Sequence, residues 1–299
     1  PKKGGGVLCQ GVPVRYAFIQ AHQGVFTVAA LCRMLRVSRS GYYAWRQAPE
    51  SPRAAENRRL DAGIQRLFDE HRGRYGAPRI TLDLQAEGWR VSRRRVAKRM
   101  RAMGLRARAA RRFKATTQST HRLPVAPNRL QQDFTAAGPN QKWVADITYL
   151  WTGEGWLYLA VVLDLYSRAV VGWSMAKRIT KELVMAALTM ALFRRRPPPG
   201  LILHSDRGSQ YAALDYQALL EQHGLLCSMS RKGDCYDNAA MESFFHTLKV
   251  EQIQGARYPT REAAKADVFE YIETYYNPKR RHSTLNYQSP WDFEDRRAA

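Results

Sequence analysis

The sequence predicts two parts of different fold class: an all-α region in the first half of the chain and a mixed α/β domain in the second. Three observations predict this division. Positive charge is concentrated in the first half, apolar residues recur there at helical spacing, and β-rich runs begin only after Lys142. We therefore expect a cation-rich helical region followed by a domain that contains a sheet.

Charge divides the 299 residues unevenly. Residues 1–140 hold 28 Lys and Arg residues but only 8 Asp and Glu, whereas residues 141–299 hold 20 against 18. Arginine outnumbers lysine in the first half, and the guanidinium group forks onto phosphate oxygens. A merely solubilising arginine surface, or a tail that binds acidic protein, is the alternative. The size of the imbalance favours nucleic acid as the partner of the first half.

The remaining composition excludes several classes of protein. No run approaches the roughly 18 apolar residues that a membrane span needs, so no membrane partner is expected. The basic N-terminus is not followed by an apolar signal core, which favours a cytoplasmic protein over an exported one. The four cysteines form no CxxC pair and support neither a disulfide framework nor a zinc site.

Residues 1–50 are predicted to form a helix-turn-helix-like N-terminal segment. Within it, residues 27–47 show the pattern of a helix, a tight turn and a second helix. Val28, Leu31 and Leu35 form an apolar stripe, and Ser38 can cap the second helix.

Residues 51–105 are predicted to form a basic helical DNA-binding domain, with helices over 53–71, 77–88 and 91–104. The third helix carries cations and no acid, and its apolar side is narrow. The cations on such a helix would repel one another unless an anion neutralised them, so we expect the helix to lie against DNA phosphates or in a major groove. Its cations are Arg93, Arg94, Arg95, Lys98, Arg99 and Arg101. Residues 106–140 lack periodicity and are predicted to be a basic linker.

From residue 141 to 299 the pattern is that of an α/β domain. Three consecutive antiparallel strands are expected over 143–150, 156–167 and 169–175, then a helix over 180–196. A short buried strand (201–205), a helix (214–224), a strand (225–230) and helices over 238–253 and about 260–276 follow, before a basic tail. This is the element order of the ribonuclease-H-like fold, a mixed five-stranded sheet with helices. The element order does not determine the strand order.

Three carboxylates stand out by position. Asp146 interrupts an apolar strand, Asp206 follows the buried strand 201–205, and Glu242 lies on the helix that begins near residue 238. Taken singly, each has an ordinary explanation as a hydrogen-bond acceptor, a turn former or an exposed helix residue. Together they match the hard oxygen ligands needed by two divalent metal ions for phosphoryl transfer at a diester. Other acids fit less well, namely Asp133, Asp164, Asp234 and Asp237.

The motifs around these carboxylates carry a resemblance to a known family. The chain resembles insertion-sequence transposases of the IS-three family, in their integrase-like OrfB frame, which are related to retroviral integrases. The motifs that carry the resemblance are WVADITYL, LDLYSR, HSDRGSQY, GDCYDNAAMESFFHTLK and YYNPKRRHSTLNYQSP. Between Asp206 and Glu242 lie 35 residues, the spacing of the DDE signature of that family.

The resemblance implies a transposase that binds the terminal inverted repeats of its element. It would cleave DNA and transfer the strand through a 3'-hydroxyl, using two Mg²⁺ ions per active site, or Mn²⁺ as a substitute, on Asp146, Asp206 and Glu242. Lys249 matches a position that contacts DNA near the active site. Further DNA contacts are expected from Arg207, Lys279, Arg280 and Arg281.

The expected partners are double-stranded DNA of the transposon ends and the target, and further copies of the chain, as a dimer or a larger assembly on DNA. Fusion or partnership with the product of an upstream frame is also expected, and a location on the bacterial nucleoid. Two alternatives stay open: a ribonuclease-H-like nuclease that uses only water as nucleophile, and a non-catalytic helix-turn-helix regulator.

Overall fold

The computed structural model describes residues 10–47, 51–108, 125–231 and 238–298. The chain forms two compact units, Pro1–Arg66 and Leu67–Ala299. Helix α4 (Pro52–Glu70) begins in the first unit and ends in the second. The segment limits predicted at residues 50, 105 and 140 rest on composition and stay predictions.

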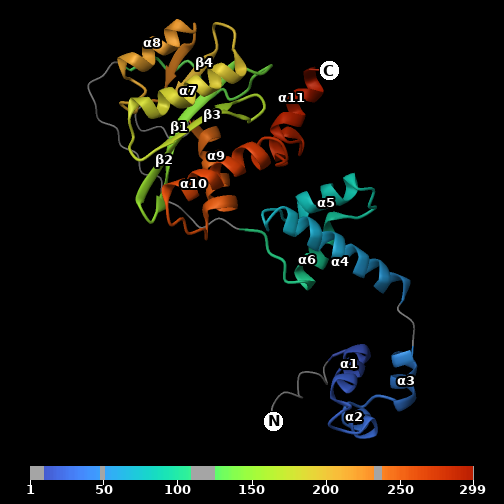
Figure 1. Cartoon of the computed structure of the whole chain (residues 1–299). Coiled ribbons are helices and arrows are strands. Elements are labelled where there is room, and N and C mark those ends of the chain that lie inside the picture. Colours follow the sequence, from blue (N-terminus) through green and yellow to red (C-terminus); the bar gives the residue numbers. More distant parts are fainter. Residues whose placement is uncertain (1–9, 48–50, 109–124, 232–237, 299) are drawn as a thin grey trace. The chain divides into compact units, whose positions relative to one another are not determined.

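The first unit contains three short helices, α1 (Val12–His22), α2 (Val28–Met34) and α3 (Arg39–Gln47) (Figure 1). The side chains of Ile19, Leu31 and Tyr42 are buried in one cluster between them. Thr27 caps α2, and the Ser38 hydroxyl accepts a hydrogen bond from the Gly41 N–H at 3.2 Å in the first turn of α3. The predicted helix-turn-helix pattern over 27–47 is confirmed. Helix α1 was not predicted.

Helices α4, α5 (Ala77–Ala86) and α6 (Arg93–Ala102) confirm the predicted basic helical region. Ser92 caps α6 by accepting a hydrogen bond from the Arg95 N–H at 3.3 Å. Val96 and Met100 are buried, which leaves the remaining circumference of α6 to its cations.

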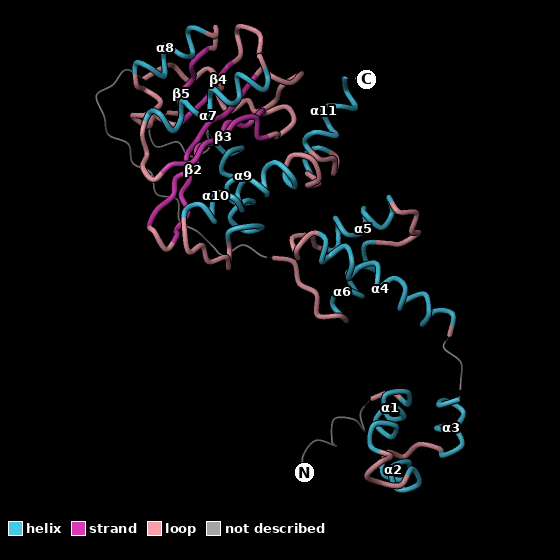
Figure 2. The backbone as a smooth tube through the Cα atoms, viewed as in Figure 1, coloured by secondary structure: helices cyan, strands magenta, loops and turns pink. Residues whose placement is uncertain are grey.

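The second unit is built on a mixed five-stranded sheet with the order β3-β2-β1-β4-β5 (Figure 2). Strand β2 (Gly155–Asp164) is antiparallel to both of its neighbours, β1 (Lys142–Thr152) and β3 (Val170–Ala176). Strands β4 (Ile202–Ser205) and β5 (Leu226–Met229) are parallel to β1. The predicted sheet is confirmed, and β1 is its central strand.

Helices cover both faces of this sheet (Figure 1). α7 (Lys181–Arg195) and α8 (Leu214–Gln222) share one buried cluster with Trp143 and Ala145 of β1. α9 (Ala239–Leu248) and α10 (Arg261–Phe269) also pack on β1 but lie outside that cluster. Because side chains alternate along a strand, Asp146 faces away from the α7 and α8 cluster. The fold therefore directs Asp146 to the face covered by α9.

The close approach of α7 to β3 depends on a glycine. A β-carbon at Gly172 would lie 2.2 Å from the carbonyl oxygen of Ala187. Any larger residue at this position would force the helix away from the sheet.

The C-terminal helices depart from the predicted regularity. α9 continues as a π-helix over Lys249–Ile253, and α10 continues as a π-helix over Glu270–Tyr276. A short 3₁₀ turn (Ser283–Leu285) and α11 (Pro290–Ala298), which was not predicted, complete the chain. The predicted extents 238–253 and 260–276 are correct, but the winding within them changes. π-helical turns insert an extra residue and often occur near functional sites.

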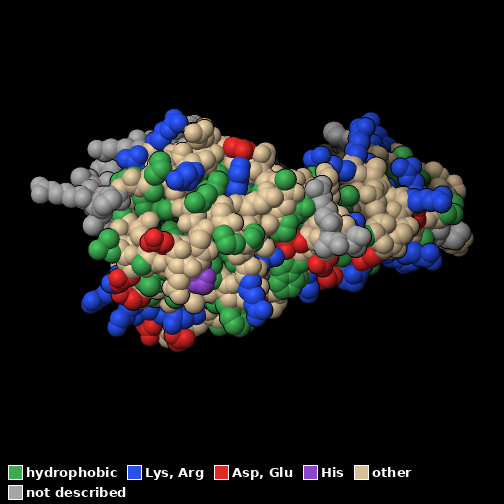
Figure 3. All heavy atoms as spheres, turned by 90° about the horizontal axis from the view of Figure 1, so that it is seen from above, with side chains coloured by type: hydrophobic (Ala, Val, Ile, Leu, Met, Phe, Trp, Pro, Cys, Tyr) green, Lys and Arg blue, Asp and Glu red, His purple; other side chains and the backbone are tan. Residues whose placement is uncertain are grey.

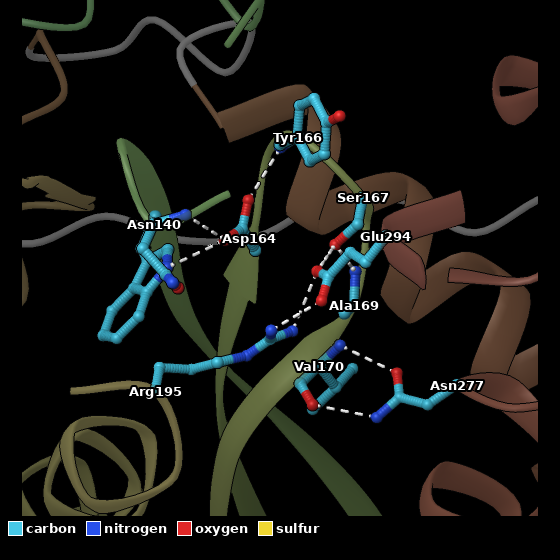
Figure 4. A network of polar contacts seen from close by, with 10 residues as sticks. Asn140, Asp164, Tyr166, Ser167, Ala169, Val170, Arg195, Asn277 and Glu294 are labelled. Carbon is cyan, nitrogen blue, oxygen red and sulfur yellow. Dashed lines mark hydrogen bonds and ion pairs between the residues drawn. The ribbon is translucent and has the colours of Figure 1, made fainter. Parts of the chain in front are cut away.

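A polar network ties the tail to the sheet (Figure 4). Asn277 exchanges two hydrogen bonds of 2.9 Å with the backbone of Val170, and Glu294 of α11 binds Arg195 of α7 with two bonds of 2.6 and 2.9 Å. Glu294 also accepts a hydrogen bond from the Ser167 hydroxyl. Asn277 and α11 are thus packed as part of the second unit.

Among the described residues, no helix has both the length and the apolar character required to cross a membrane.

Candidate active site

Two of the predicted carboxylates lie at the same level on adjacent parallel strands. Ala145 of β1 pairs with Ser205 of β4, and in each strand the next residue is an aspartate. Asp146 and Asp206 therefore lie side by side across the sheet at the carboxyl end of β4. Strand ends of this kind are where α/β folds place their sites.

Asp146 lies in an electrostatic environment that opposes its negative charge. Its side chain accepts a hydrogen bond from the Ile147 N–H at 2.7 Å. Burial, followed by the charges of Asp206 and Glu242, raises the pKa of Asp146 to about 8, against the lowering effects of the Ile147 N–H and Lys249. A carboxyl group so disfavoured as an anion is stabilised by a nearby cation.

Asp206 is held in a tight turn. Its Oδ1 accepts a hydrogen bond from the Gly208 N–H at 2.8 Å. The neighbouring Arg207 points elsewhere, because its Nε donates to the carbonyl oxygen of Ser230 at 2.6 Å. The structure thus gives Arg207 a role in joining the ends of β4 and β5.

Glu242 is exposed in the first turn of α9, close enough to Asp146 to raise its pKa. Because Glu242 is exposed, the side of the carboxylate site that faces α9 is open to solvent. In the described part of the chain, no group of three or more His, Cys, Asp or Glu side chains is tight enough to enclose a metal ion. Residues 232–237, which include Asp234 and Asp237, lie outside the described residues and precede α9 in the chain.

The donor set fits a divalent cation. Mg²⁺ binds carboxylate oxygens and keeps several waters, so it needs no closed protein cage. Burial and the charges of Asp206 and Glu242 disfavour the anionic form of Asp146, and a divalent cation bound by these carboxylates would offset both effects. These residues can therefore hold a hard metal ion.

Lys249 lies at the point where α9 changes into the π-helix. Its Nζ is 5.1 Å from the centre of the Tyr149 ring, an exposed aromatic of β1. Burial lowers the pKa of Lys249, and the Asp146 carboxylate opposes that effect. The structure thus brings the predicted DNA-contact lysine to the edge of the carboxylate site.

Two tyrosines at this site were missed in the sequence. Tyr149 forms the platform under Lys249. Tyr211 is fully buried, its hydroxyl has no hydrogen-bond partner among the described residues, and its pKa is raised by burial and then by Asp146 and Asp206. The run HSDRGSQY contains Tyr211, but nothing in its spacing shows that the ring folds back beside the aspartates.

The other predicted DNA contacts fall into two groups. Arg93, Arg94, Lys98 and Arg101 of α6 are exposed, as is Lys279, whereas Arg95 and Arg99 are half-buried. Arg280 is 4% exposed and binds Glu251 with two bonds of 2.8 and 2.7 Å, and Arg281 binds Asp83 at 2.6 Å. Lys and Arg side chains are spread over the face of the molecule shown in Figure 3.

The acids set aside in the sequence have structural explanations. Asp164 is fully buried and accepts hydrogen bonds from the Asn140 N–H at 2.7 Å, the Tyr166 N–H at 2.8 Å and the Trp143 indole at 3.2 Å (Figure 4). Asp133 binds Lys142 at 2.6 Å, and the hydrogen bond from Lys142 lowers its pKa.

Comparison with protein families gives three matches along the chain. Residues 54–113 match an HTH-like domain, and residues 136–235 and 242–297 match integrase core domains. Together these models span the helices α4 to α6, the sheet and the C-terminal helices.

Two curated relatives and one solved structure illustrate the similarity. The chain is 51% identical over 288 residues to the transposase InsF for insertion sequence IS3A of Escherichia coli K12, covering 96% of this chain and 100% of the relative. It is 49% identical over 266 residues to an uncharacterized 31 kDa protein of insertion element IS600 of Shigella sonnei, covering 89% and 98%. A chain of the simian T-cell lymphotropic virus intasome aligns with a TM-score of 0.45 at 16% identity, covering 77% of this chain and 74% of that one.

The aspartates at the ends of adjacent strands, the mixed sheet and the 51% identity to InsF over 96% of the chain lead to one conclusion. The chain belongs to the IS3 family of transposases, polynucleotidyl transferases with an integrase core and an HTH-like DNA-binding domain.

Proposed function

We propose that Asp146, Asp206 and Glu242 are the catalytic carboxylates of this transposase. The observation that carries the proposal is the placement of Asp146 and Asp206 at the same level on adjacent strands, with Glu242 on α9, which packs on β1. Burial, followed by the charges of Asp206 and Glu242, raises the pKa of Asp146 to about 8. Carboxylates brought together at such a cost mark functional sites more often than structural ones.

Each residue has a role that follows from its element. Asp146 and Asp206, on the adjacent strands β1 and β4, form the rigid side of the site, and Glu242 closes it from α9. Lys249, held near Asp146 and over Tyr149, is positioned to bind a DNA phosphate that approaches the carboxylates. Tyr211 is buried close enough to Asp146 and Asp206 for their charges to raise its pKa, so it supplies an apolar ring near the carboxylates.

Divalent metal is the cofactor that this donor set fits, and we propose two Mg²⁺ ions per site, with Mn²⁺ as a substitute. When bound, they supply activation of the attacking oxygen and stabilisation of the leaving oxygen at a phosphodiester. The carboxylates hold and orient them, and the same site serves water in cleavage and a 3'-hydroxyl in strand transfer.

The DNA substrate is proposed to be the terminal inverted repeats of the element, followed by target DNA. The exposed cations of α6, Arg93, Arg94, Lys98 and Arg101, are the proposed contacts to the end, with the half-buried Arg95 and Arg99 beside them. Lys279 is proposed to bind phosphate near the core. The active form is proposed to be a dimer or larger assembly on bacterial nucleoid DNA, alone or joined to an upstream-frame product.

The test compares Asp206→Asn with Asp215→Asn, a change of the same kind at an exposed acid of α8 that pairs with Lys181. Cleavage of a duplex bearing the terminal repeat should disappear in Asp206→Asn and persist in Asp215→Asn. Binding of Mn²⁺, followed by electron paramagnetic resonance without DNA, should weaken only in Asp206→Asn. Equal Mn²⁺ binding by both variants would remove Asp206 from the metal site.

Membership in the transposase family favours this function over both alternatives, a ribonuclease-H-like nuclease and a non-catalytic helix-turn-helix regulator. A strand-transfer assay separates the nuclease: joining of a 3'-hydroxyl end to a second duplex requires an activity that a water-only nuclease lacks.

A further inference from the structure

A cavity of about 350 Å³ lies beside α9, between α5 and the C-terminal tail. Its walls carry three arginines and several hydroxyl groups, with no carboxylate among the described residues that line it. The residues that define it chemically are Arg79, Arg168, Arg280, His282, Ser243 and Thr284. We call this cavity the arginine pocket.

The positive charge of the arginine pocket is only partly neutralised within the described residues. Glu251 binds Arg280 through both of its carboxylate oxygens and lies 3.7 Å from Arg79. The Nε of Arg79 is buried without a hydrogen-bond partner among the described residues. The guanidinium group of Arg168 forms no hydrogen bond or ion pair with any described residue, although burial lowers its pKa. The charge of Asp164 also acts on Arg168, so two carboxylates, Glu251 and Asp164, face three guanidinium groups.

The other titratable groups of the pocket add no negative charge. Burial, followed by the charges of Arg280, Arg79 and Arg168, lowers the pKa of His282 to about 3, so that ring is neutral at physiological pH. Its Nε2 shares a hydrogen bond with the Tyr276 hydroxyl at 3.0 Å. Burial raises the pKa of Tyr276, which keeps its hydroxyl protonated. An external anion is therefore what the pocket lacks.

The lining groups match a tetrahedral oxyanion. Guanidinium groups donate forked hydrogen bonds to phosphate oxygens, and hydroxyls such as those of Ser243 and Thr284 add single donors. Ala239 and Ala240, the first residues of α9, also line the pocket, so the positive end of the helix dipole adds to the arginines. An acidic peptide is less well matched, because a carboxylate is planar and carries only two oxygens.

The position of the pocket identifies the source of the phosphate. Ser243 and Thr247 of α9 line it, and Glu242 of the same helix belongs to the proposed catalytic site. We propose that the arginine pocket binds one backbone phosphate of the DNA strand that enters the active site, and so fixes that strand relative to α9. The inference rests on the proposed function, in that DNA is the substrate of the carboxylates.

The first experiment asks whether the pocket binds phosphate at all. The melting temperature of the full chain, free of metal and DNA, is compared in inorganic phosphate and in chloride at equal ionic strength. Phosphate should raise it in the wild type and in Arg178→Gln, an exposed arginine outside the pocket, but not in Arg168→Gln. An equal response of all three proteins overturns the site. No step of this test depends on cleavage or metal, so it is readable even if the carboxylate assignment fails.

The second experiment asks whether the phosphate belongs to DNA. Binding of a duplex with the terminal repeat is measured in EDTA over a range of salt concentrations. Arg168→Gln should lower the slope of log affinity against log salt by about 0.9, the value of one phosphate contact, whereas Arg178→Gln should keep the slope of the wild type. A scan with single uncharged methylphosphonates locates the contact, because the neutral position should weaken the wild type about tenfold or more and leave Arg168→Gln unaffected.

Two outcomes would overturn the assignment to DNA: a slope unchanged in Arg168→Gln, or a methylphosphonate profile identical to that of the wild type. A second variant guards against misfolding of the first. Thr284→Glu adds a carboxylate at the exposed wall of the pocket, so it should raise the melting temperature, abolish the response to phosphate and reduce DNA affinity. A Thr284→Glu protein that keeps its phosphate response would contradict the proposal.

Discussion

Two groups of charged side chains in the second unit, a buried one around Glu251 and a half-buried one around Asp146, are organised in opposite ways. Around Glu251, the carboxylate receives two bonds from Arg280 and one from the Tyr271 hydroxyl at 2.9 Å, and its charge is fully compensated. Around Asp146, the nearest charges are two further carboxylates, opposed only by Lys249 among the described groups. This difference indicates that Glu251 stabilises the fold, whereas the carboxylates around Asp146 are suited to binding a cation from solution.

The same contrast separates two aspartates on neighbouring strands. Asp164 of β2 accepts three hydrogen bonds from N–H groups, while Asp146 of β1 accepts one from its own neighbour. Burial raises the pKa of both carboxyl groups. At Asp146 the charge of Asp206 is the next largest cause and Glu242 adds to it, whereas at Asp164 the hydrogen bonds from the Asn140 and Tyr166 N–H groups outweigh the charge of Glu294. This difference marks the functional residue.

The largest expected effect comes from neutralising the uncompensated site. Asp146→Asn should reduce cleavage by about 1,000-fold or more, because a metal ligand that supplies several kcal/mol of transition-state stabilisation is removed. The melting temperature of the metal-free protein should rise at neutral pH, because Asn avoids the cost that the raised pKa of Asp146 imposes on the folded state. Asp164→Asn should do the reverse, with a lower melting temperature and retained cleavage at temperatures below it. Cleavage assays and calorimetry on both variants check this. Equal changes of cleavage and melting temperature in the two variants would contradict the distinction between Asp146 and Asp164.

Neutralising the compensated site should cost stability instead. Glu251→Gln leaves the Arg280 guanidinium buried without its partner and should lower the free energy of unfolding by about 3–5 kcal/mol. Glu270→Gln is the matched control, because that acid also pairs with an arginine, Arg72, but is half exposed. Its cost should stay below about 1 kcal/mol. Urea unfolding measures both, and similar decreases would show that burial does not separate the two pairs.

A pH dependence should sharpen the difference further. The pKa of Asp146 is raised in the folded protein from its ordinary 3.8 to about 8, so the folded state holds a proton that the unfolded state releases. Its contribution to stability is complete below about pH 4, falls as pH rises, and is lost above about pH 8, with a slope of at most about 1.4 kcal/mol per pH unit.

This slope is the difference between the wild type and Asp146→Asn, measured by denaturant titration of metal-free protein. Saturating Mg²⁺ should flatten it, because metal binding requires the ionised carboxylate. A wild type and variant that respond identically to pH would show that Asp146 ionises normally.

The smallest effect concerns the cations of the helical region. Replacing Arg93, Arg94 and Lys98 with Ala should lower the slope of log DNA affinity against log salt by up to about 0.9 for each phosphate that is no longer neutralised. The melting temperature should change little, because these side chains are exposed. A base contact among the three would also reduce the preference for the terminal repeat over a scrambled duplex by about 1–3 kcal/mol. An unchanged slope would assign these cations to solubility alone.

Much of the fold was predictable because its signals are local. The strands of the sheet are continuous apolar runs between turns, and Ser92 marks the start of α6 by its capping chemistry. Helix α1 escaped prediction because its sequence, VPVRYAFIQAH, is only weakly amphipathic. α11 escaped because the contacts that hold it, from Glu294 to Arg195 and Ser167, come from distant elements.

The sequence by itself determined the residue types that matter and their order: Asp146 in an apolar strand, Asp206 after the short buried strand 201–205, and Glu242 on a helix after an interval of 35 residues. It did not distinguish Arg280 and Arg281, which are internally paired, from Arg168, which lacks a partner among the described residues. Only the tertiary structure decided which charges are compensated. The physical reason is that desolvation and Coulomb energy depend on burial and on the distance between groups, and both arise from contacts between segments far apart in the chain.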